Sequence, residues 1–220
     1  MKSINSDIAE LLLSIKAVSI NTKKPFRYTS GILSPIYCDN RLIMSYPDVR
    51  KKIVEAYIKI IKEEVGLKNV EVVSGTAMAA IPQTAWVSDH LKIPMVFVRP
   101  SKKEHGKENK VEGTFKKGAK VVIIEDHIST GGSTIDNLTA IKGMGGKVKF
   151  AIATTTYEME SAANAFKENK IKVFTLTTIT DILNMAVKLG TLKENEVELV
   201  KEWTKDTVGW GKKMGFEDAI

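Results

Sequence analysis

The segment AKVVIIEDHISTGGSTIDNLTAIKGMGG, residues 119 to 146, decides the fold class. Its first part is an uninterrupted apolar run that ends in two acids, which is typical of a buried parallel strand. A glycine pair follows, and after it comes a helical pattern that further glycines close. A strand, a tight turn and a helix in this order make one βα unit, so the segment predicts an α/β fold.

The same alternation of strands and helices runs through the chain from about residue 46. The predicted strands cover residues 70–75, 93–99, 119–126, 147–156 and 171–179. The predicted helices cover residues 46–66, 78–91, 131–146 and 161–170, with tail helices at 181–190 and 194–203. We therefore expect a parallel sheet flanked by helices on both faces, with ligands bound beyond the carboxyl ends of its strands.

The first 45 residues do not follow this alternation. An amphipathic helix is expected at the N-terminus, and FRYTSGILSPIYCDNR, residues 26 to 41, predicts a strand pair or an extended loop with turns at Ser30–Gly31 and Ser34–Pro35. We interpret residues 1–45 as a helix and a small hood, 46–190 as the core and 191–220 as a helical tail, all in one integrated domain.

The composition excludes several classes of protein. Hydrophobic residues make up 43% of the chain and charged residues 27%, and no stretch is long and apolar enough for a membrane span. The N-terminal segment does not resemble a signal peptide, and Cys38 is the single cysteine, so we expect a cytoplasmic protein without a disulfide framework or a multi-cysteine zinc site. We expect Cys38 to be a buried structural thiol, because no histidine lies nearby in sequence to activate it.

The net charge of +7 is compatible with nucleic-acid binding, with small anionic substrates or with a solvated lysine-rich surface. The excess lysines are spread along the chain and form no long run of one sign. We therefore favour a solvated surface first and small anionic ligands second, and expect neither a nucleic-acid nor a membrane partner.

The stretch ISTGGST, residues 128 to 134, has the features of an anion-binding turn. Gly131 and Gly132 permit a tight backbone at a helix N-terminus, where N–H groups and the helix dipole favour a phosphate. Hydroxyl groups of the neighbouring serines and threonines add donors. The alternative is an ordinary glycine turn with helix capping. The pattern is neither a Walker A loop nor G-x-G-x-x-G, which disfavours nucleoside triphosphatases and dinucleotide-binding dehydrogenases.

Glu125 and Asp126 directly precede this turn. Two carboxylates at a buried strand end are costly unless they have hydrogen-bond donors or a cation. A sugar diol supplies such donors and Mg²⁺ supplies charge, so a ribose 5-phosphate would satisfy the acids and the turn together. The alternative is a surface acidic pair that caps the turn.

A long polar segment, residues 98 to 113, follows another predicted strand. Its length and composition are those of a lid that closes over a ligand. A lid of this charge would suit a diphosphate; the alternative is a solvated loop. The basic residues of the segment are Arg99, Lys102, Lys103, His105, Lys107 and Lys110.

Together these residues resemble a known family. IIEDHISTGGST, residues 123 to 134, is similar to the phosphoribosyl pyrophosphate (PRPP) motif of the type I phosphoribosyltransferases. FRYTSGILSPIYCDNRLIMSYPDVR, SGTAMAAIP and FVRPSKKEHGKENKVEG resemble, in this order, the bacterial orotate phosphoribosyltransferases. The resemblance runs from about residue 6 to 205. It implies a glycosyltransferase of pyrimidine (UMP) biosynthesis that makes orotidine 5-monophosphate and pyrophosphate from orotate and PRPP.

The resemblance also implies roles for particular residues. Lys103, Asp126 and Arg99 would be catalytic, and Ser129, Tyr37 and Cys38 would bind orotate. Mg²⁺ would be held through the pyrophosphate of PRPP, without a firm direct protein ligand, and the enzyme would be a homodimer in which the basic segment completes the neighbouring site. The residues implied in PRPP binding are Arg99, Lys103, His105, Glu125, Asp126, His127, Ile128, Ser129, Thr130, Gly131, Gly132 and Ser133.

The chain departs from the family pattern at several positions. Thr29, Ala79 and Pro100 stand where some members carry lysine, and no arginine near TTTYEME matches one that some members use for orotate. Lys102 is a candidate replacement for a missing cation. Two rival functions stay open: transfer to another base such as a purine, which the hood sequence disfavours, and a PRPP-sensing regulator, for which the N-terminus lacks a clear helix-turn-helix.

Overall fold

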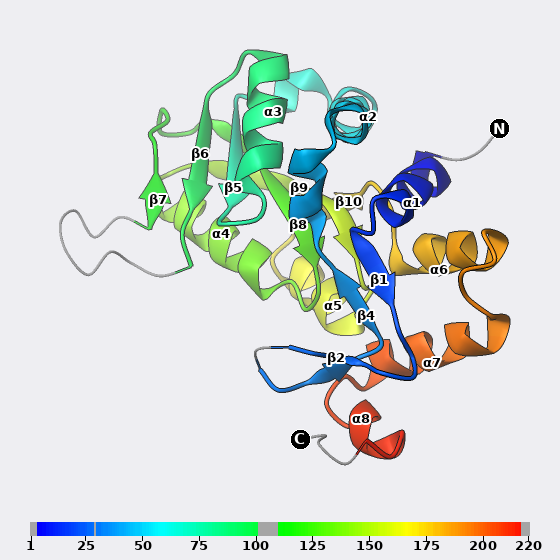
Figure 1. Cartoon of the computed structure of the whole chain (residues 1–220). Coiled ribbons are helices and arrows are strands. Elements are labelled where there is room, and N and C mark those ends of the chain that lie inside the picture. The colour runs from blue at the N-terminus through cyan, green and yellow to red at the C-terminus, as the bar shows by residue number, and fades with distance from the viewer. Residues whose placement is uncertain (1–3, 29, 101–109, 217–220) are drawn as a thin grey trace.

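The computed structural model describes residues 4–28, 30–100 and 110–216. Its centre is a six-stranded sheet with the order β10-β9-β8-β5-β6-β7 (Figure 1). Neighbouring strands are parallel except β7, which pairs antiparallel with β6. The strands are β5 (Val72–Thr76), β6 (Met95–Val98), β7 (Val111–Glu112), β8 (Lys120–Ile128), β9 (Lys147–Thr156) and β10 (Lys172–Thr175). The predicted parallel sheet is confirmed for five strands, and β7 is a short antiparallel edge strand that the sequence patterns did not predict.

Helices cover both faces of this sheet, as predicted. Successive residues of β8 alternate between two hydrophobic clusters, so that Val122 and Ile124 face one layer of helices and Val121 and Ile123 the other. The helices α4 (Gly132–Gly143) and α5 (Glu160–Glu168) pack on the second face. On the first face lie α1 (Ile4–Ser14), α2 (Pro47–Ile60), α3 (Ile81–Leu91) and α6 (Ile179–Lys188).

The N-terminal hood contains two short antiparallel strand pairs. β1 (Val18–Ile20) pairs with β4 (Ile36–Cys38), and β2 (Phe26–Arg27) pairs with β3 (Leu33–Ser34). Gly31 has a φ of 87° in the turn between β2 and β3, where a strand pair with a Ser30–Gly31 turn was predicted. A short 3-10 helix, η1 (Asn40–Ser45), then leads from the hood into α2.

The C-terminal helices complete the hood. These are α7 (Glu194–Lys205) and α8 (Trp210–Lys213). Trp203 of α7 is 1% exposed, and its Nε1 donates to the carbonyl of Leu33 in β3 at 2.9 Å. Hood and tail therefore pack together, while the three-part division of the chain stays a prediction. Within the described residues, no helix combines the length and the apolar character needed to cross a membrane.

Candidate active site

The acid pair lies inside strand β8, two residues before its end at Ile128. The strand was predicted to end at Asp126, whereas β8 continues for two more residues, so the acids lie within the strand and not at its last position. Pairing between β5 and β8 stops at Gly75 and Ile124, whereas pairing between β8 and β9 continues to Ile128. The acids therefore stand at the carboxyl edge of the sheet, where β8 has already lost one of its two neighbouring strands.

The Glu125 carboxylate is buried, with 2% of the residue exposed. Its Oε2 accepts hydrogen bonds from the Ser133 hydroxyl at 3.1 Å and the Thr134 hydroxyl at 3.2 Å. Its Oε1 accepts from the main-chain N–H of Asp126 at 3.2 Å. Burial first, and the adjacent Asp126 charge second, raise the pKa of Glu125 to about 8. Burial therefore favours the protonated form of Glu125, and its hydrogen bonds link strand β8 to the first turn of α4.

Asp126 is half-buried and is the more accessible acid of the pair. Burial also raises its pKa, while the Arg41 guanidinium acts in the opposite direction. Arg41 is held by Asp39 in a two-point contact, with Nε to Oδ1 at 2.7 Å and NH2 to Oδ2 at 3.1 Å. The structure thus brings a cation of the hood near the acid pair, which the sequence patterns did not indicate because Arg41 lies far from Asp126 along the chain.

The glycine turn has the conformation that anion binding requires. Gly131 precedes α4 with a φ of 84°, in the left-handed region that favours glycine. A Cβ at this position would lie 2.9 Å from Cζ of Phe166 in α5, so the site also excludes a side chain sterically. Thr130, Gly132 and Ser133 are exposed around it. The N-terminus of α4 is therefore open to a ligand, although the Ser133 hydroxyl is directed to Glu125 in this structure.

The side chains of His127 and Ile128 point away from this turn. Ile128 is 2% exposed and belongs to the core beneath α4. The His127 ring packs edge-on against the Tyr157 ring, with the ring centroids 4.1 Å apart, and Nδ1 of His127 lies 2.8 Å from Oγ1 of Thr155. Burial lowers the pKa of His127 to about 4, so the ring is neutral. Because both side chains are engaged inside the protein, the predicted contacts of these two residues with PRPP could be made only by their main-chain groups.

Among the predicted orotate contacts, Ser129 is half-buried and its hydroxyl lies 3.6 Å from Sδ of Met159. Tyr37 and Cys38 are consecutive residues of β4, so their side chains project to opposite faces of the strand. Tyr37 is exposed, whereas burial raises the pKa of the Cys38 thiol to about 12. The raised pKa agrees with a structural thiol rather than a nucleophile. Because the two side chains project to opposite faces of β4, only one of them can face a ligand on a given side of the hood.

The predicted basic lid is described at its two ends only. Arg99 forms an ion pair with Glu112 of β7 at 3.6 Å, and Lys110 forms one with Asp136 of α4 at 3.3 Å. The lid therefore begins beside the edge strand β7 and ends beside α4, the helix that carries the glycine turn. Lys102, Lys103, His105 and Lys107 lie outside the described residues, as does Thr29 of the hood.

Two further departures from the family pattern flank the carboxyl edge. The turn after β5 contains a cis peptide bond between Ala77 and Met78, and the Met78 side chain is exposed. Pro100 follows Arg99 at the start of the lid. Some family members carry lysines in the turn after β5 and directly after the arginine of the lid. In this chain Ala79 and Pro100 stand at these two positions.

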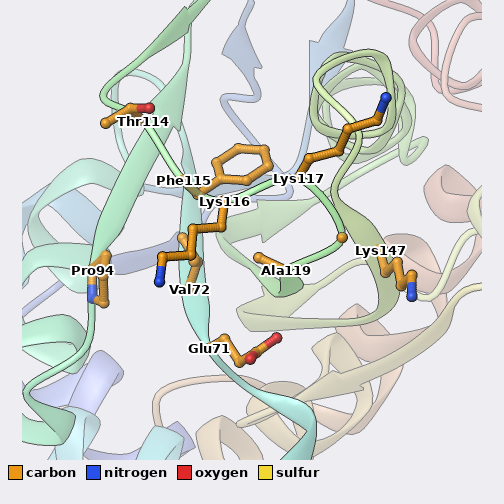
Figure 2. Close-up of a pocket in the computed structure, with 10 residues that line it drawn as sticks. Glu71, Val72, Pro94, Thr114, Phe115, Lys116, Lys117, Ala119 and Lys147 are labelled. Carbon is orange, nitrogen blue, oxygen red and sulfur yellow. The ribbon is translucent and has the colours of Figure 1, made fainter.

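A cavity of about 780 Å³ lies at the opposite edge of the sheet (Figure 2). Its lining includes Glu71, Pro94 and Lys147, which stand at or just before the amino ends of β5, β6 and β9. The lysines around it are exposed, and no side chain of the acid pair or the glycine turn reaches it. Its size therefore does not make it the active site, because the convergent polar groups lie at the carboxyl edge.

The residues present suit a metal that arrives with a phosphorylated ligand. Among the described residues no group of three or more His, Cys, Asp or Glu side chains could hold a metal ion. Asp126 is the available carboxylate, since Glu125 is buried and already accepts three hydrogen bonds. Mg²⁺ is commonly bound by one or two carboxylates together with substrate phosphates. The donor set is therefore compatible with Mg²⁺ bound largely through a substrate, which stays a prediction.

The fold is that of an α/β protein that carries an acid pair and a glycine turn at the carboxyl edge of its sheet, an arrangement suited to a phosphorylated sugar. Residues 46–188 match the family described as "Phosphoribosyl transferase domain". An orotate phosphoribosyltransferase of Enterococcus faecalis is 44% identical over 212 residues, which cover 96% of this chain and 100% of that protein. The chain belongs to the phosphoribosyltransferase family, in the branch of the orotate phosphoribosyltransferases.

Solved structures agree with this fold. The orotate phosphoribosyltransferase of Aeropyrum pernix has a TM-score of 0.71 at 24% identity, covering 84% of this chain and 99% of that one. The Mycobacterium tuberculosis orotate phosphoribosyltransferase in complex with 5-phospho-alpha-D-ribosyl 1-diphosphate has a TM-score of 0.62 at 18% identity, covering 82% and 99%. These likenesses confirm the predicted type I phosphoribosyltransferase architecture.

Proposed function

We propose that this chain transfers the phosphoribosyl group of PRPP to orotate, giving orotidine 5-monophosphate and pyrophosphate. One observation carries the proposal: an acid pair in β8 runs into a glycine turn at the N-terminus of α4, in a chain 44% identical over the full length of an orotate phosphoribosyltransferase. A ribose 5-phosphate uses both parts, since its phosphate accepts from the turn and its hydroxyls donate to a carboxylate.

The reaction then depends on positioning and on charge stabilisation. The bond between the anomeric carbon and pyrophosphate breaks, its electron pair leaves with pyrophosphate, and positive charge develops on the ribose. The orotate nitrogen, already deprotonated, then forms the new bond on the opposite face. Asp126 would hold the ribose hydroxyls, and the first turn of α4 would hold the 5-phosphate. Arg99 and Lys103 would stabilise charge on the departing pyrophosphate. When bound, largely through the substrate and with Asp126 as the available carboxylate, Mg²⁺ would neutralise part of the charge of the pyrophosphate.

The test is a spectrophotometric assay of orotate consumption with PRPP and Mg²⁺. We expect turnover with orotate and none with adenine or guanine as the acceptor. Turnover with a purine but not with orotate would show that the chain acts on another base. Binding of DNA in a gel shift, without turnover of any base, would favour a regulator.

We also propose a homodimer in which the basic lid of one subunit acts in the site of the other. Exposed apolar side chains support a contact surface beside the site: Leu42, Met44 and Tyr46 on η1 or at its end, and Met78 in the turn after β5. Exposed apolar side chains of this kind occur at subunit interfaces. The cytoplasmic location remains a prediction from the sequence.

Subunit complementation tests this arrangement. The variants Lys103→Ala and Asp126→Asn are each expected to be nearly inactive. When they are mixed and allowed to exchange subunits, a hybrid dimer has one site with both residues intact, so about a quarter of the wild-type activity should return. No recovery, in a mixture shown by mass spectrometry to contain hybrids, would place lid and acid pair in the same subunit's site. A monomeric mass by light scattering would refute the dimer.

A further inference from the structure

A side chain of the hood contacts the main chain of the acid pair. Asn40 is the first residue of η1 and is 1% exposed. Its Nδ2 donates to the carbonyl oxygen of Asp126 at 2.7 Å and to Oγ1 of Thr155 at 2.8 Å. These partners lie 86 and 115 positions away in the sequence. The contact therefore joins the hood to the ends of strands β8 and β9.

The direction of the Asn40 amide is fixed by its partners. A carbonyl oxygen can only accept, so the amide nitrogen rather than Oδ1 must face Asp126. Oδ1 is buried and has no hydrogen-bond partner among the described residues. A buried acceptor without a donor is unfavourable, yet this orientation still gives the amide two donated bonds. The contact with the Asp126 carbonyl thus sets the orientation of the side chain.

A second side chain holds the neighbouring residue in the same way. The Tyr57 hydroxyl of α2 donates to the Glu125 carbonyl at 2.8 Å and lies 2.8 Å from Oγ1 of Thr154. Tyr57 is fully buried. Two consecutive carbonyls of β8 are therefore bound by side chains from outside the sheet. This occurs where β8 has lost its pairing with β5, so the strand ladder alone does not fix the acids on both sides.

We propose that Asn40 is a positioning residue for the transfer reaction: its amide fixes the main chain at Asp126 and so aims the Asp126 carboxylate at the ribose of PRPP. This rests on the proposed function. Asn40 itself is buried, so we expect it to act through Asp126 and not through a contact with the substrate. Its effect is on geometry, and a displacement of about 1 Å in a reacting group can lower a rate by roughly 100-fold.

The experiment compares the variants Asn40→Ala and Asn40→Asp with the wild type across a range of pH. Asn40→Ala removes the donor, and we expect kcat to fall by about 10- to 100-fold while the KM for orotate changes by less than about 3-fold. Asn40→Asp keeps the shape but puts a carboxylate oxygen against a carbonyl. When protonated, that carboxyl can donate again, so its kcat relative to wild type should recover as the pH falls, whereas that of Asn40→Ala should not.

A matched control is Asn169→Ala. Asn169 also donates its amide to a main-chain carbonyl, that of Ala165 at 2.9 Å, but at the end of α5. Its kcat should equal that of the wild type. Thermal unfolding establishes which variants are folded at the assay temperature, and the pH response of Asn40→Asp decides the matter where Asn40→Ala is unfolded.

The inference is overturned if folded Asn40→Ala keeps a kcat within about 2-fold of wild type, or if Asn40→Asp shows no relative recovery at low pH. A wild-type protein that fails to consume orotate refutes the proposed function instead. In that case the increase in melting temperature on adding PRPP with Mg²⁺ still tests the positioning, because it should be smaller in Asn40→Ala than in wild type and Asn169→Ala. An equal increase in all three proteins would overturn it.

Discussion

The proton on Glu125 gives the sharpest prediction, which concerns the pH dependence of stability. Burial raises the pKa of Glu125 from 4.5 to about 8 in the folded protein. The folded state therefore keeps a proton that the unfolded chain releases above its own pKa. The resulting stability is fully present below the unfolded value and is lost as the pH rises through about 8. Glu125→Gln replaces the acid with a neutral group that cannot ionise.

The expected magnitude follows from the size of the shift. Each pKa unit corresponds to about 1.36 kcal/mol. Integrated for a single group, the Glu125 contribution to the free energy of unfolding should fall by about 3 kcal/mol between about pH 5.5 and 8. His127 acts in the opposite direction at the acid end, because burial lowers its pKa to about 4. That effect is common to wild type and variant, so it cancels in their difference.

The assay is urea unfolding of ligand-free protein, followed by fluorescence of the buried Trp203 and Trp210. Glu125→Gln should gain about 3 kcal/mol relative to wild type across this pH range. Glu71→Gln is the control, since Glu71 is exposed while its Oε2 accepts from the main-chain N–H of Lys120 at 2.8 Å. A constant difference between Glu125→Gln and wild type would show that Glu125 is ionised in the fold, and the argument from burial would be wrong.

Three further substitutions test other parts of the structure. Gly131→Ala should destabilise the protein by about 1–3 kcal/mol, because of the positive φ and the close Phe166 ring, and should weaken PRPP binding measured by calorimetry. Trp203→Phe should cost about 1–2 kcal/mol in urea unfolding, since the Leu33 carbonyl loses its donor while most of the ring packing remains. Lys103→Ala should lower kcat roughly 100-fold or more with a much smaller change in PRPP affinity; an unchanged kcat would end its catalytic role.

Much of the fold could be predicted because its signals are local. The apolar run before Glu125 and the glycine pair at Gly131 specify a buried strand and a turn through their own backbone preferences. The helix and strand patterns from residue 46 onward are equally local, and the structure confirms that these elements exist. The strand predicted over residues 171–179 was too long, because β10 ends at Thr175 and helix α6 begins at Ile179. Strand β7 was missed because two residues carry no periodic signal, and only its pairing with β6 defines it.

The organisation of the site could not be predicted in the same way. Asn40, Arg41 and Tyr57 reach the acid pair only after the hood and α2 have folded against the sheet. Nothing in their sequence neighbourhoods marks them. The raised pKa of Glu125 could not be predicted from the sequence either, because it depends on how deeply the carboxyl group is buried and on the nearness of a second charge. The sequence therefore led to a hypothesis for the residues of the site, but not to the hydrogen bonds and burial that make two adjacent acids tolerable.

These states imply that the two acids have different functions. A neutral Glu125 removes one of two negative charges beside the phosphate turn, and its bonds to Ser133 and Thr134 connect β8 to α4. Asp126, the more accessible acid, is then the carboxylate left for the ribose hydroxyls. At about pH 6, Glu125→Gln should therefore keep kcat within about 3-fold of wild type, because an amide resembles the protonated acid.

Asp126→Asn should instead lose roughly 100-fold or more of kcat/KM for PRPP under the same conditions, since it removes the carboxylate that we propose for the ribose hydroxyls and the developing positive centre. Steady-state kinetics of both variants at about pH 6 and pH 9 measures the contrast. Equal losses at about pH 6 would mean that both acids act as carboxylates on the substrate. In that case PRPP binding must remove the proton from Glu125, and proton release on binding, measured by calorimetry in buffers of different ionisation enthalpy, should approach one per site.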